Sequence, residues 1–107
     1  MRHFIILESP YAGNIGQNLT YLKRALRDSW ERGEHPLASH GYYPLFLSET
    51  NPSERKAGIE AGYAMWPLAQ RIVFYSDYGM SNGMGAALDR AVHHNLEIVT
   101  RTIGPNP

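Results

Sequence analysis

The chain has 107 residues, enough for a single hydrophobic core, so we expect residues 1–107 to form one domain. Ten basic side chains balance ten acidic ones, which argues against binding to a nucleic-acid polymer or to an acidic membrane surface. There is no cysteine, which excludes disulfides, thiolate metal ligands and a cysteine nucleophile.

The first predicted element is a strand over residues 3–7, which is apolar on both faces and therefore central in a parallel sheet. This apolar run is too short for a signal peptide or a membrane span, so we expect a cytoplasmic protein. After the strand, Pro10 and Gly13 break the pattern and leave polar groups at its carboxyl end.

A long helix is expected next. Asn14 and Gln17 have the spacing of a capping box, and the helical pattern ends near Gly33. Large apolar residues that recur at the 3.6-residue period predict its buried face: Ile15, Leu19, Leu22, Leu26 and Trp30.

The next segments are short. Residues 35–39 predict a brief second strand with Ser39 and His40 at its end. Residues 41–47 are rich in aromatic side chains and predict a short helix, since Pro44 is allowed in a first helical turn.

A further helix has a clear start. Asn51 is suited to the cap position, Pro52 to the first helical position and Glu54 to the third. Ile59 and Tyr63 are expected to supply its apolar face.

The last third begins with a predicted strand over residues 71–75 and a glycine-rich segment over residues 77–85. A helix to about residue 94 and a final strand over residues 96–100 follow. Ser81 is suited to cap this helix, and Gly83 lets a ligand approach the backbone. Free N–H groups and the helix dipole favour a phosphate there, although the same residues are also typical of an ordinary tight turn.

Strands that alternate with helices predict an α/β fold with a mainly parallel four-stranded sheet and helices on both faces. In such sheets ligands bind outside the carboxyl ends of the strands, where the strand order reverses. We therefore expect residues 8–13, 39–40 and 77–84 to meet at one rim. The candidate ligand-binding residues at this rim are Ser9, Tyr11, Gly13, His40, Asp77, Ser81, Asn82, Gly83 and Met84.

Most rim side chains allow two interpretations. Burial directly after a strand would raise the pKa of Glu8 and suit it for acid–base or nucleophilic catalysis, whereas a solvated turn carboxylate would do neither. His40 is either a phosphate ligand or proton carrier, or a structural histidine. Asp77 would orient a sugar hydroxyl or hydrogen-bond the glycine-rich segment, and Tyr11 would stack on a base or fill a gap.

Three stretches resemble the nucleoside 2-deoxyribosyltransferase superfamily, which includes nucleotide N-hydrolases. They are Ser-Pro-Tyr-Ala-Gly at residues 9–13, Asp77 at a strand end, and Ser-Asn-Gly-Met-Gly at residues 81–85 before a helix. Nearly the whole chain, including Gly-Glu-His-Pro-Leu-Ala-Ser-His at residues 33–40, resembles a small branch of it found in phage and bacterial genomes.

The resemblance implies a small Rossmann-like or flavodoxin-like three-layer sandwich and a homodimer or larger homo-oligomer, often with a neighbour completing the pocket. It also implies that Ser81, Gly83 and the amide of Met84 bind a 5′-phosphate. By the same resemblance, Tyr11 holds the nucleoside and Asp77 touches the sugar or the base.

One position departs from the family pattern. The nucleophilic glutamate of the family lies six residues after the serine, where this chain has Ala87. Alanine cannot attack the anomeric carbon, and Asp89 lies about 200° further round the helix. A carboxylate would have to come from Glu8 or from a neighbouring subunit.

Two functions remain from this reasoning. In the first, the protein binds a nucleotide or nucleoside-derived molecule without reaction and sequesters a nucleotide signal, as an anti-defence protein of a phage would. In the second, it is an active nucleotide N-glycosidase or deoxyribosyltransferase-like enzyme that uses Glu8. Neither needs a cofactor, and no metal is expected because the adjacent His93 and His94 diverge on a helix. A structural domain without a ligand is a third possibility.

Overall fold

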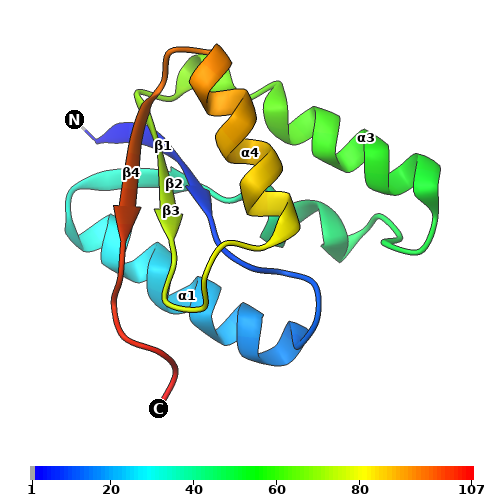
Figure 1. The fold of residues 1–107 in the computed structure, drawn as a ribbon, viewed down its shortest axis with the longest axis horizontal. Helices are drawn as coiled ribbons and strands as arrows, with labels where there is room; N and C mark the ends of the chain where they lie inside the picture. The colour runs from blue at the N-terminus through cyan, green and yellow to red at the C-terminus, as the bar shows by residue number, and fades with distance from the viewer. Residues whose placement is uncertain (1) are drawn as a thin grey trace.

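Four strands form one sheet in the computed structural model, which describes residues 2–107 (Figure 1). They are β1 (His3–Glu8), β2 (Glu34–Leu37), β3 (Arg71–Tyr75) and β4 (Glu97–Arg101). Their order is β2-β1-β3-β4, and every neighbouring pair is parallel. The predicted α/β fold with a four-stranded parallel sheet of the small Rossmann-like or flavodoxin-like kind is confirmed.

Helices cover both faces of this sheet. α1 (Ile15–Glu31) packs on one face, where its apolar residues join a core with Ile5, Leu7, Val73 and Tyr75. α4 (Asn82–His93) packs on the other face, in a core that includes Ile6, Ile72, Phe74, Met84 and Ala87. Because side chains alternate along a strand, odd-numbered residues of β1 and β3 point to α1, and even-numbered residues point to α4.

The segment between β2 and β3 contains α2 (Ser39–Tyr42), η1 (Tyr43–Leu45), α3 (Pro52–Tyr63) and η2 (Trp66–Leu68). Asn51 caps α3 as predicted, since its side chain accepts from the amides of Ser53 and Glu54. The second strand ends at Leu37, and Ser39 begins α2 instead of extending that strand.

α2 and α3 approach closely at Gly62. A Cβ atom there would lie 2.5 Å from Ser39 Oγ, so the contact requires glycine. The predicted apolar face of α3 is only partly buried, because Ile59 is exposed and its two buried residues are Gly58 and Gly62. This packing fixes α2, and with it His40, beside the sheet.

The predicted buried face of α1 is confirmed in part. Leu22 is buried and Leu26 packs against the core, but the prediction is wrong for Ile15, Leu19 and Trp30, which are 38–44% exposed. The buried residues of α1 are Asn18, Tyr21, Leu22, Ala25 and Ser29. Asn18, Tyr21 and Ser29 are polar, but each donates a hydrogen bond, to a loop carbonyl, to Asp77 or to Glu34. A buried polar group with a partner carries little penalty, and a search for apolar periodicity does not detect it.

The strand order reverses between β1 and β3. From β1 the chain continues through α1 to β2, which lies on one side of β1. From β2 it returns past β1 to β3, which lies on the other side of β1. The carboxyl ends of β1 and β3 therefore flank the switch point, where ligands bind in such sheets. Within residues 2–107, no helix has the length and apolar character needed to cross a membrane.

Candidate functional site

The sheet divides the predicted rim residues between its two faces. Glu8 follows Ile6 in the alternation of β1 and lies on the α4 face, opposite Phe74 of β3. Asp77 follows Tyr75 and lies on the α1 face, where it contacts Tyr21. The residues do collect at one edge of the sheet, but they do not line one common surface.

Glu8 is the most perturbed carboxyl group at this edge. Its side chain is 14% exposed, and nothing within residues 2–107 donates a hydrogen bond to its carboxylate. Burial raises its pKa to about 8, so Glu8 is a neutral carboxylic acid at pH 7. Of the two interpretations of Glu8, its burial favours a partly buried acid over a solvated turn carboxylate.

His40 and Ser9 lie next to Glu8. Ser9 Oγ is 2.7 Å from His40 Nε2, and His40 Nδ1 is 3.8 Å from Glu8 Oε2. Nδ1 is buried without a hydrogen-bond partner, and burial lowers the pKa of His40 to about 4. His40 is therefore neutral. The order Ser–His–Glu resembles a hydrolase triad, but Ser9 is only 3% exposed, which leaves a substrate little access to its hydroxyl.

The first turn of α4 contains the predicted phosphate site. Ser81 Oγ accepts from the amide of Met84, which confirms the predicted cap. Within the described chain, the amides of Asn82 and Gly83 donate to no other group, as is usual for a first helical turn. A Cβ atom at Gly83 would meet no atom within 4 Å. The corner is thus open, and Figure 1 shows the first turn of α4 at the end of the sheet toward which the strand arrows point.

Both carboxylate oxygens of Asp77 accept hydrogen bonds from other parts of the chain. Its carboxylate accepts from the Tyr21 hydroxyl and from the amides of Ile103 and Gly104. Burial alone would raise its pKa, but these hydrogen bonds outweigh burial and lower it. Asp77 therefore ties the C-terminal segment to α1, and both of its carboxylate oxygens already accept hydrogen bonds from these groups.

Tyr11 and Gly13 lie in the loop that leads from β1 into α1. Asn18 donates to the carbonyl oxygens of Tyr11 and Ala12, and Gly13 has a φ of 93°. These contacts fix the loop at the switch point. The Tyr11 side chain is half-buried, and its two interpretations stay open.

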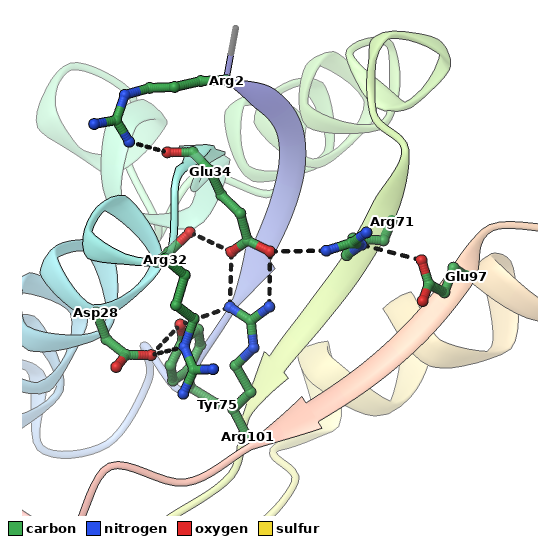
Figure 2. A network of polar contacts seen from close by, with 9 residues as sticks. Arg2, Asp28, Arg32, Glu34, Arg71, Tyr75, Glu97 and Arg101 are labelled. Atoms are coloured by element: carbon green, nitrogen blue, oxygen red, sulfur yellow. Dashed lines mark hydrogen bonds and ion pairs between the residues drawn. The ribbon is translucent and has the colours of Figure 1, made fainter.

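A buried polar network, which the sequence reasoning missed, lies under the C-terminal end of α1 (Figure 2). Glu34 forms two 2.7 Å contacts with Arg101 and one of 3.1 Å with Arg71, and it accepts from Ser29. These charges and donors hold the pKa of Glu34 down, at about 2. Both terminal nitrogens of the Arg101 guanidinium donate to Glu34.

A groove of about 500 Å³ lies outside the rim, along α3. It is lined on one side by α3, and Arg90 of α4 reaches into it and covers the Tyr63 ring at 4.0 Å. Burial and the charge of Glu8 raise the pKa of Tyr63, whose side chain lines this groove. No group of three or more potential metal ligands occurs in the described part of the chain.

The comparisons with known proteins identify a family. The model of the family described as Domain of unknown function (DUF7768) matches residues 3–101. No curated protein and no solved structure matches the chain.

Proposed function

The chain belongs to the DUF7768 family, and we propose that it binds a small nucleotide-like molecule whose phosphate lies at the first turn of α4. The open α4 corner carries this proposal: Ser81 caps the helix, and in the described part of the chain two amides have no acceptor and no atom lies within 4 Å of a Cβ position at Gly83. Such a corner combines hydrogen-bond donors with the positive end of the helix dipole.

The neighbouring Glu8 supports the same function. An ionised carboxylate beside the corner would repel a phosphate, but Glu8 is neutral at pH 7 because burial raises its pKa to about 8. The base and sugar would extend from the corner toward Glu8 at the switch point. In this proposal the protein acts in the cytoplasm as a homodimer or larger homo-oligomer, and its role is to sequester a nucleotide signal.

A matched pair of substitutions tests the phosphate site. Asp and Asn both cap helices well, so Ser81→Asp and Ser81→Asn should both keep α4 folded. Ser81→Asp adds a negative charge at the corner, and at about 4 Å from a phosphate it costs roughly 1–4 kcal/mol. We expect Ser81→Asn to bind 2′-deoxynucleoside 5′-monophosphates about as well as the unmodified protein, and Ser81→Asp to bind at least about fivefold more weakly.

Calorimetric titration of both variants gives the readout, and the matching nucleosides without phosphate serve as controls. Equal affinities of the two variants would show that no phosphate lies at this corner. Nucleosides that bind as tightly as nucleotides would lead to the same conclusion.

A second candidate function is N-glycosidic cleavage. Ala87, at the position of the expected nucleophile, is buried in the core against the sheet, so this position cannot supply the chemistry. Glu8 lies on the same face of the sheet and is held in its acid form, which is suited to protonating a departing base. Chromatography after incubation with deoxynucleotides distinguishes the two functions. Free base that depends on Glu8 indicates an enzyme, and intact ligand released only on heating indicates sequestration.

A further inference from the structure

The carboxyl group of Glu8 has no hydrogen-bond partner among the polar groups of the described chain. No donor within residues 2–107 reaches its oxygens, yet the side chain keeps a small solvent-exposed part. A buried carboxylate normally has such donors, and one that lacks them is stable only as the neutral acid. The acid form carries one O–H donor in addition to its acceptor oxygen.

The imidazole of His40, which lies beside Glu8, is uncharged. The contact with Ser9 fixes Nε2, and the ring turns the buried, unpartnered Nδ1 toward Glu8 at 3.8 Å. That distance is too long for a hydrogen bond, so Glu8 does not donate its proton to His40.

The other elements near Glu8 bring no compensating charge. Tyr63 on α3 is neutral, since burial and Glu8 itself raise its pKa. Arg90 on α4 lies over the Tyr63 ring and forms no ion pair with Glu8. Around Glu8, the described chain therefore offers a serine, a neutral histidine and a tyrosine, but no cation that would hold a carboxylate.

We propose that Glu8 binds the ligand as a neutral acid, donating its proton in a hydrogen bond to a ring nitrogen or carbonyl oxygen of the ligand's base. Ser9 and His40 bond to each other beside Glu8, at the switch point between β1 and β3, and leave the proton of Glu8 available. This inference rests on the proposed nucleotide site and deepens it. The ligand therefore carries an anionic group that binds at the first turn of α4. It also carries a separate, neutral hydrogen-bond acceptor that binds Glu8, as a nucleoside monophosphate does.

The pH dependence follows from the state of Glu8. Its pKa is raised to about 8, so the donor is present below that pH and is lost above it. Affinity should be constant between about pH 7 and 7.5 and fall by up to about tenfold for each pH unit well above 8, as one proton is lost. The phosphate of the ligand is already fully ionised in this range, because its second pKa is about 6.

The test is calorimetric titration of the four 2′-deoxynucleoside 5′-monophosphates between about pH 7 and 9.5. Glu8→Gln keeps a neutral donor of similar size, so it should still bind at pH 7 within about threefold and lose the decline above pH 8. Glu8→Ala should bind these nucleotides about tenfold more weakly, with unchanged weak binding of inorganic phosphate. The exposed Glu31→Gln is the control and should behave like the unmodified protein.

Each outcome separates this inference from the proposed function. In one outcome, nucleotides bind, Ser81→Asp weakens their binding, and Glu8→Gln shows the same pH profile of affinity as the unmodified protein. The proposed role of Glu8 is then wrong, and the proposed phosphate site is retained. Affinity that rises above pH 8 also overturns the inference. If the unmodified protein binds none of the four nucleotides, both proposals fail.

Discussion

Glu34→Gln tests the buried network beneath α1. Glu34 is 4% exposed and accepts from Arg101, Arg71 and Ser29 (Figure 2). Removing its charge leaves the Arg101 guanidinium buried without a counter-ion, which typically costs about 3–5 kcal/mol. The pKa of Glu34 gives a similar magnitude. It falls from 4.5 to about 2, which corresponds to about 3 kcal/mol of unfolding free energy at neutral pH.

The sign of the pH dependence can be stated. Because the folded-state pKa is lowered, the contribution of Glu34 is complete above the ordinary value of 4.5 and is lost as the pH falls toward 2. The difference in unfolding free energy between the unmodified protein and Glu34→Gln should be about 3 kcal/mol near pH 7. It should shrink steadily below about pH 4.5, since protonated Glu34 then resembles glutamine.

Urea denaturation followed by circular dichroism measures this difference at each pH. The control is Glu31→Gln, which removes an exposed ion pair with Arg27 and should cost less than about 0.5 kcal/mol. If Glu34→Gln costs no more than Glu31→Gln, the network contributes little and the reasoning is refuted. A difference that persists unchanged near pH 2 would show that it does not come from the charge of Glu34.

Two other substitutions test the packing around the site. Asp77→Asn leaves one of its partners without an acceptor oxygen, so we expect a loss of about 1–3 kcal/mol and faster amide exchange at Ile103 and Gly104 by NMR; unchanged exchange there would contradict the assigned contacts. Gly62→Ala places a methyl group 2.5 Å from Ser39 Oγ and should cost about 1–3 kcal/mol in thermal unfolding. The matched Gly83→Ala meets no atom within 4 Å and should stabilise α4 by up to about 1 kcal/mol, so similar effects of the two changes would count against the α2–α3 contact.

The local structure was largely predictable from the sequence. The strand at residues 71–75 and the caps at Asn51 and Ser81 appear as predicted, because apolar strand runs and capping residues act over a few neighbouring residues. The alternation of strands and helices also determined the parallel sheet and its carboxyl-terminal rim. These features depend on short-range interactions and on the handedness of crossovers.

Tertiary structure alone decided how the polar residues are used. Glu8 ends β1 and Asp77 follows the neighbouring β3, but they lie on opposite faces of the sheet, and only the register shows this. Arg101 and Glu34 are 67 residues apart and meet beneath α1. The same holds for the buried Tyr21 of α1, whose hydroxyl donates to Asp77, 56 residues further along the chain. A polar side chain is acceptable in the interior when a partner satisfies it, and for Tyr21 and Arg101 that partner is brought close by the fold and not by the neighbouring sequence.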